Sequence, residues 1–160
     1  MTPLSVLRAK RYGANYALRI YLEAKRAGIP YSLGLALIEQ ESNFKNVFGH
    51  DPVRSPQIQG GSVTKSRYRR YKHLRRQGYG MQGVGPAQLT YYTFQDDADR
   101  LGGCWKPKFN IRVAFSHLAA LIKAHGERDG IRRYNGSGPA ADRYASSVLE
   151  RKRKWHRRVT

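Results

Sequence analysis

The stretch of sequence that decides the fold reads Leu33-Gly34-Leu35-Ala36-Leu37-Ile38-Glu39-Gln40-Glu41. Its first six residues are apolar on every side of a helix, and a helix of this kind is usually buried. Ser32 is suited to cap its N-terminus, and the polar pair Ser42-Asn43 marks its end. We therefore expect a central helix whose two carboxylates, on Glu39 and Glu41, lie at the rim of its apolar surface.

Outward from this helix, helix signals recur along the chain. Thr64 is suited to cap a helix over 65–76. Asn110 is suited to cap the helix predicted by the clearest amphipathic pattern of the sequence. A last helix begins at Ala140 and becomes strongly basic from Arg151. These patterns predict that most of the chain is helical.

Strand signals are weak everywhere, with one region of interest. Four glycines within 78–85 favour a tight turn over a helix, so we expect a small hairpin within 57–89. The expected fold class is therefore α+β and predominantly α-helical.

The composition describes a single domain over 1–160 with an unusual charge. Apolar residues make up 40% of the 160 residues and charged residues 26%, which is ordinary for a globular protein. Thirty Lys and Arg against eleven Asp and Glu leave a net charge of +19, which attracts polyanions such as nucleic acid, anionic lipid or a teichoic-acid-bearing cell wall. The one cysteine, Cys104, excludes a disulfide framework and a multi-cysteine metal site. No apolar run reaches the ~18 residues of a membrane span, and Met1–Lys10 shows no secretory signal.

The sequence lacks the motifs of several kinds of catalytic or cofactor site. No Gly-x-Ser-x-Gly elbow occurs, and Gly83-Val84-Gly85-Pro86 lacks the residues that would complete a phosphate-binding loop. His117 and His125 lie about two helical turns apart with no third metal ligand. The remaining histidines, which have no ligand spacing either, are His50, His73 and His156. We therefore expect neither a metal nor a cofactor.

The scarce carboxylates are the better candidates for chemistry. Glu41 follows Leu37 and Ile38 by one helical turn, and Glu39 follows apolar residues in the same way, so periodicity alone does not choose between them. Desolvation at the rim of an apolar helix favours the neutral carboxyl, which could then act as a general acid near neutral pH. The alternative is that both are helix-end carboxylates exposed to solvent.

Four motifs in a fixed order span roughly residues 30–150. They are Ala36-Leu37-Ile38-Glu39-Gln40-Glu41-Ser42-Asn43-Phe44, Gly83-Val84-Gly85-Pro86-Ala87-Gln88-Leu89-Thr90, Asn110-Ile111, and Arg133-Tyr134-Asn135-Gly136-Ser137-Gly138 followed by Tyr144. In this order they resemble the motifs of the lytic transglycosylase family, and the second is similar to that of phage-encoded wall-degrading enzymes related to goose-type lysozymes. The resemblance implies a lysozyme-like fold with the hairpin across the cleft from the catalytic helix.

The resemblance also implies roles for individual residues. It assigns Glu41 as the catalytic acid, because this Glu directly precedes Ser42, and it puts Glu39 at a variable position. Ser42 would orient the glycan, Gln88 would hydrogen-bond sugar substituents, and the hydroxyl of Tyr134 would steady the carboxyl of Glu41. The substrate-binding residues implied in this way are Ser42, Gln88, Tyr134, Asn135 and Tyr144.

The implied reaction is cleavage of the MurNAc–GlcNAc bond of peptidoglycan, by one of two routes. Glycoside hydrolysis usually needs a second carboxylate, for which Asp51, Asp96 and Asp97 are available, with Asp51 and Asp97 the first choices. Lytic transglycosylases use one Glu, and the 6-hydroxyl of muramic acid attacks in place of water. Asp51 could equally form a turn before Pro52, and the other two could favour the N-terminal half of their helix. We favour hydrolysis slightly and leave the outcome open.

Two short stretches hold thirteen of the thirty cationic residues, seven in Lys65–Arg76 and six in 151–160. We expect Lys65–Arg76 and Arg151–Arg158 to attach the protein to anionic wall polymers or to a membrane surface, with Trp155 contributing to the latter. Tyr68 and Tyr71 within the first stretch could instead stack on nucleic acid bases. The plain alternative is that both stretches are solvated helix faces.

The sequence as a whole predicts a monomeric, endo-acting muramidase of the endolysin or tail-lysin type, with peptidoglycan as its partner and no specific nucleic acid. We expect synthesis in the cytoplasm and action on the bacterial wall, reached through a holin or in a phage virion. The rival predictions are a basic nucleic-acid-binding protein and a non-catalytic cationic domain that binds the wall or the membrane.

Overall fold

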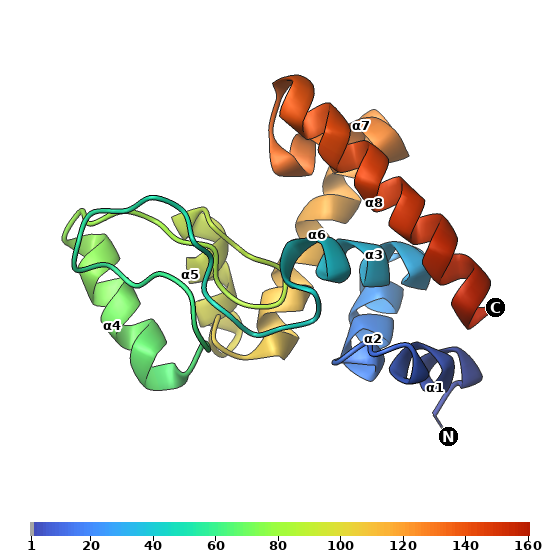
Figure 1. The fold of residues 1–160 in the computed structure, drawn as a ribbon, viewed down its shortest axis with the longest axis horizontal. Coiled ribbons are helices and arrows are strands. Elements are labelled where there is room, and N and C mark those ends of the chain that lie inside the picture. Colours follow the sequence, from blue (N-terminus) through green and yellow to red (C-terminus); the bar gives the residue numbers. More distant parts are fainter. Residues whose placement is uncertain (1) are drawn as a thin grey trace. The chain divides into compact units, whose positions relative to one another are not determined.

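The computed structural model describes residues 2–160, and these residues form eight helices (Figure 1). They are α1 (Leu4–Arg11), α2 (Ala17–Ala27), α3 (Tyr31–Ser42), α4 (Lys65–Arg76), α5 (Tyr92–Leu101), α6 (Pro107–His125), α7 (Glu127–Asn135) and α8 (Gly138–Val159). Thr64 caps α4 as predicted, because its Oγ1 accepts a hydrogen bond from Arg67 N at 3.2 Å. Ser32 and Asn110 were expected as caps, but they lie inside α3 and α6.

The predicted α+β fold and its β-hairpin are wrong, because residues 2–160 contain no sheet and the fold is all-helical. Pairing of extended backbone is reduced to isolated antiparallel bridges. These bridges join Val47 to Ser62, Phe48 to Val84, and Val84 to Leu89. The glycine-rich segment therefore forms turns and loops where a hairpin was expected.

Buried side-chain amides take the place of a strand ladder in this segment. Asn110 is fully buried, and its Nδ2 donates to Val84 O at 2.8 Å while its Oδ1 accepts from Ala87 N at 2.9 Å. Gln95, also fully buried, donates through Nε2 to Gln82 O at 2.9 Å. Because buried backbone groups need hydrogen-bond partners, these amides make an irregular backbone stable without strands.

Replacing Asn110 by Ala should therefore destabilise the protein by about 1–3 kcal/mol, since it leaves the buried Ala87 N–H without a partner and removes one of the two hydrogen bonds that Val84 O accepts. Urea unfolding followed by circular dichroism measures this loss. Asn15→Ala is a matched control, because Asn15 is exposed, and its effect should stay within about 0.5 kcal/mol. Equal stability of the two variants would contradict the role given to the Asn110 amide.

The chain divides into two compact units. Unit 1 consists of Met1–Gln40 and Ala114–Thr160, and unit 2 is Glu41–Val113. The division falls inside α3 and α6. The expectation of a single domain over 1–160 stays a prediction.

The core of unit 1 is built around α3. Residues 32–38 are all buried, which confirms the burial predicted for this apolar helix. A Cβ at Gly34 would lie 3.0 Å from the ring of Phe115, so any larger residue would crowd the close approach of α3 to α6. Helix α1 packs against α2 and α8, and α7 packs against α8 (Figure 1).

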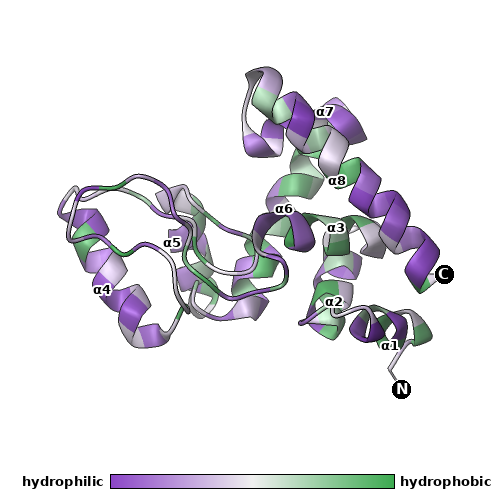
Figure 2. Ribbon diagram, in the orientation of Figure 1, coloured by the Kyte–Doolittle hydropathy of each residue, from purple (hydrophilic) through white to green (hydrophobic). Residues whose placement is uncertain are grey.

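In unit 2, aromatic side chains of α4 form the core with the loops around them. Tyr68 and Tyr71 are buried, and the Tyr71 ring lies 5.5 Å from that of Phe48. The Tyr68 hydroxyl donates to Asp99 Oδ2 at 2.9 Å. Figure 2 shows hydrophilic residues concentrated on α4 and on the second half of α8, the two basic stretches of the sequence.

Candidate functional site

The C-terminal end of α3 presents Glu41 and Ser42, both partly exposed. Ser42 Oγ donates to Pro86 O at 2.7 Å and accepts from Lys45 N at 3.2 Å. The structure thus joins the first motif to the second, because Pro86 belongs to the turn that also carries Gln88.

The backbone on both sides of this junction is held in an unusual conformation. Asn43, Phe44 and Gln88 have φ values of 50°, 61° and 48°, in the left-handed region that non-glycine residues seldom adopt. Phe44 holds this conformation while its side chain is buried. Strained residues of this kind persist only where the surrounding structure fixes them, and they cluster at functional sites.

The side chain of Gln88 is committed mainly to the backbone. Its Nε2 donates to Val47 O at 2.8 Å and to Gly85 O at 2.9 Å. A Cβ at Gly83 would lie 2.5 Å from Gln88 Oε1, so a larger residue there would displace this amide. Within residues 2–160 the Oε1 atom accepts no hydrogen bond, so Gln88 could offer a sugar an acceptor at this atom but no free N–H donor.

Glu39 is an anion held by its neighbours in unit 1. Its carboxylate accepts from Lys154 Nζ at 2.7 and 2.8 Å and from Trp155 Nε1 at 3.0 Å, and Arg151 lies 3.3 Å away. Burial alone would raise the pKa of Glu39, but these hydrogen bonds and positive charges outweigh it and lower the pKa. A carboxylate held ionised in this way is a poor general acid, which favours Glu41 of the two candidates that periodicity left open.

The three candidate aspartates differ in their surroundings. Asp96 lies 2.7 Å from Arg75 and 3.6 Å from Lys72, and although burial acts to raise its pKa, these cations lower it. Asp97 pairs with Arg100 one turn along α5. The exposed Asp51 is fixed through its backbone, where its N–H donates to the Oε1 atom of a buried glutamine, Gln82, at 2.9 Å. No ion pair or hydrogen bond of the Asp51 carboxylate occurs within residues 2–160.

The other three predicted site residues belong to unit 1. The ring of Tyr134, on α7, lies 5.6 Å from that of His117. Asn135 is exposed at the end of α7, and Tyr144 is half-buried on α8. Tyr134, Asn135 and Tyr144 therefore belong to a different unit from Glu41, Ser42 and Gln88. The predicted contact of Tyr134 with Glu41 stays a prediction.

Two readings of the basic stretches need correction. Tyr68 and Tyr71 are at most 1% exposed, so they are not available to stack on nucleic acid bases. Trp155 is fully buried and bonded to Glu39, so it cannot insert into a membrane surface. In both cases the aromatic residue points into the core, while most of the cations around it reach solvent.

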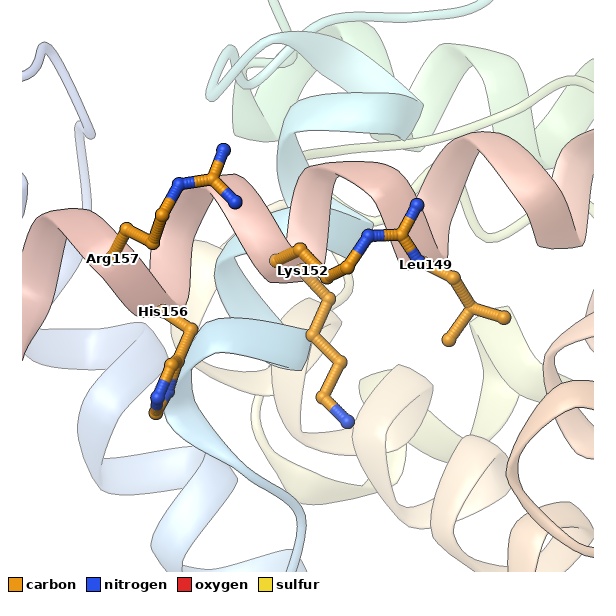
Figure 3. A pocket seen from close by; sticks show the side chains of 5 residues that line it. Leu149, Lys152, His156 and Arg157 are labelled. Carbon is orange, nitrogen blue, oxygen red and sulfur yellow. The ribbon is translucent and has the colours of Figure 1, made fainter.

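The exposed cations of α8 surround a cavity of about 490 Å³, shown in Figure 3. Its lining consists of Leu149, Lys152, Arg153, His156 and Arg157. Figure 3 shows Lys152 and His156 pointing to the same side of the helix. Lys152 is paired with Glu127, whereas Arg153 and Arg157 form no ion pair within residues 2–160. This part of α8 is suited to attract anions.

Sequence reasoning missed the structural amides of unit 2. Gln82 and Gln95 follow no periodic pattern, and the position of Asn110 before an amphipathic pattern indicates a helix cap. Their burial could not be inferred from the residue types, because glutamine and asparagine are mostly exposed in proteins. The one available signal was the density of glycines nearby. It indicates an irregular backbone, whose N–H and C=O groups need hydrogen-bond partners from side chains.

Comparison with protein-family models, curated proteins and solved structures found no match to this chain. The likeness to lytic transglycosylases and goose-type lysozymes therefore rests on the four motifs alone. Among the described residues, no cluster of His, Cys, Asp or Glu could hold a metal ion. None of the helices within 2–160 is both long and apolar enough to cross a membrane.

Proposed function

We propose that this protein is a glycosidase that cleaves the MurNAc–GlcNAc bond of peptidoglycan, with Glu41 as its general acid. The observation that carries the proposal is the end of α3, where Ser42 is hydrogen-bonded to the turn of Gln88 and the partly exposed Glu41 lies beside it. A rigid, buried helix that ends in such a carboxyl provides the fixed position that proton transfer needs. Lys154, Arg151 and Trp155 keep the carboxylate of Glu39 ionised, so Glu41 remains as the candidate acid.

In the proposed reaction, Glu41 donates its proton to the glycosidic oxygen as the bond from C1 to that oxygen breaks. The sugar then carries positive charge at C1, and a nucleophile must reach it. In hydrolysis a water attacks and loses its proton to a carboxylate, and Asp51 is the better candidate because Asp97 already pairs with Arg100. In transglycosylation the 6-hydroxyl of the muramic acid attacks C1, and the now ionised Glu41 accepts the proton of that hydroxyl.

Mass spectrometry of purified peptidoglycan digested by the full chain tests the proposal. Products with new reducing ends mean hydrolysis, and products lighter by one water mean formation of an anhydro sugar. The Asp51→Asn variant separates the routes further, because it should block hydrolysis and leave transglycosylation intact. Absence of any product from the native chain would refute the proposed function.

Attachment of the exposed cations to anionic wall polymers leads to a prediction on salt. Cleavage of intact walls should fall several-fold as salt rises from about 0.1 M to about 1 M, because the Debye length shrinks from about 10 Å to about 3 Å. Cleavage of a short, soluble glycan should change little. Release of soluble products from both substrates measures the effect.

The double variant Arg153→Ala, Arg157→Ala is the control for this prediction. Both residues are exposed on α8, so the fold should be unaffected. In this variant wall cleavage at low salt should already be reduced, and its dependence on salt should be weaker. The same salt profile in the native chain and the double variant would show that α8 does not attach the protein to the wall.

A further inference from the structure

Two large aromatic side chains lie on the surface of unit 2, next to the turn of Gln88. Tyr91 is 51% exposed and Tyr92 is 46% exposed. Their ring centroids are 5.0 Å apart with planes tilted by 45°, and Phe94 lies 6.4 Å from Tyr91. Contiguous exposed apolar side chains rimmed by polar residues mark a binding surface more often than single exposed ones do.

The ring of Tyr92 is backed by a fixed ion pair. The Arg75 guanidinium lies 6.0 Å from the Tyr92 ring, and it donates to Gln95 Oε1 at 2.6 Å and to Asp96 Oδ1 at 2.7 Å. Only 6% of the Arg75 side chain is exposed. The ring is therefore presented by a preorganised support, which lowers the entropy cost of binding.

A cavity of about 350 Å³ adjoins this ring. It is lined by Arg75, Arg76, Gly78, Gly80, Met81, Tyr92 and Asp96. Tyr92 and Met81 provide apolar surface, while Arg76 and Asp96 provide a donor and an acceptor of opposite charge. An apolar wall with a few convergent polar groups is the usual make-up of a small-molecule subsite.

We propose that Tyr91, Tyr92 and this cavity form a binding site for a neutral pyranose ring of a glycan. The C–H face of a pyranose is apolar and packs on an aromatic ring, and its hydroxyl groups can donate to Asp96 and accept from Arg76. The site rests on the proposed function in one respect, since it would hold part of the same glycan that Glu41 cleaves.

A nucleic acid strand fits this surface less well, even though its bases also stack on aromatic rings. Asp96 is the one carboxylate in the lining of the cavity, and its charge disfavours a phosphate group there. Arg75 is already paired with Asp96, so the cavity offers the charge of Arg76 alone to a phosphate. A strand-binding groove needs a row of unpaired cations along its aromatics.

Calorimetric titration with a soluble tetramer of N-acetylglucosamine tests the site. The titration uses the full chain with Glu41→Gln, so that the glycan is not cleaved. Adding Tyr92→Ala should weaken binding by about tenfold or more, and adding Tyr92→Phe should restore it because the ring is retained. Tyr12→Ala is the matched control, because Tyr12 is 54% exposed on unit 1 and should not affect binding.

The possible results separate this site from the proposed function. Unchanged affinity after Tyr92→Ala, or no binding of the tetramer at all, would overturn the site. Binding of an oligothymidine that Tyr92→Ala abolishes, with no binding of the tetramer, would overturn it in favour of nucleic acid. Tetramer binding that depends on Tyr92, with no peptidoglycan products from the native chain, would support the site and refute the proposed cleavage.

Discussion

Glu41→Gln is expected to lower the rate of peptidoglycan cleavage by about 10²–10⁴-fold, the usual contribution of a general acid. The amide has nearly the same shape as the carboxyl but no proton to donate to the leaving oxygen. Glu41 is partly exposed at the end of α3 and the amide keeps the size of its side chain, so the variant should fold. Release of reducing ends or anhydro products from purified peptidoglycan measures the rate, and thermal unfolding checks the fold.

Glu39→Gln, two residues earlier on the same helix, should give the opposite result. It removes the anion that holds Lys154 and Arg151 and that accepts from Trp155, so stability should fall. The cleavage rate for each folded molecule should stay close to that of the native chain. If Glu39→Gln were inactive and Glu41→Gln active, the general acid would be wrongly assigned.

Trp155→Ala is expected to destabilise the protein by about 3–5 kcal/mol, because it empties a large volume of the core. Trp155 is fully buried on α8, and its Nε1 donates to the Glu39 carboxylate at 3.0 Å. The loss combines a cavity with the removal of a hydrogen bond to a charged group. Urea unfolding of the native chain and the variant gives the difference.

Trp155→Phe separates these two contributions. The smaller ring fills most of the space but cannot donate to Glu39, so we expect a loss of about 1.5–3 kcal/mol, smaller than that of Trp155→Ala. His156→Ala, one residue along α8, is exposed and should change stability by no more than about 0.5 kcal/mol. Native stability in Trp155→Ala would mean that this end of α8 is not part of the core.

The helices were largely predictable because their signals are local. The apolar run of α3 required burial whatever surrounded it, and Thr64 could be recognised as a cap from its position before α4. The absence of a sheet was not predictable, because the sequence of 57–89 does not show which groups hydrogen-bond to its backbone N–H and C=O groups. The amides of Asn110 and Gln95 do so, and they come from segments that follow it in the chain.

The candidate site was predictable in part. The four motifs selected Glu41, Ser42 and Gln88, and the bond from Ser42 to Pro86 joins two of those motifs within unit 2. The sequence did not show that the side-chain N–H groups of Gln88 donate to backbone carbonyls. Tyr91 and Tyr92 had no distinguishing pattern either, because exposure of an aromatic residue depends on what packs around it.

By itself, the sequence determined the net charge of +19, the helical character and the burial of α3, since composition and periodicity act locally or as totals. Only the tertiary structure decided which charges are neutralised. Glu39 and Glu41 are two residues apart, yet Glu39 is surrounded by Lys154, Arg151 and Trp155 from α8, more than a hundred residues along the chain. The protonation state of a carboxyl follows from such neighbours, and packing rather than sequence distance chooses them.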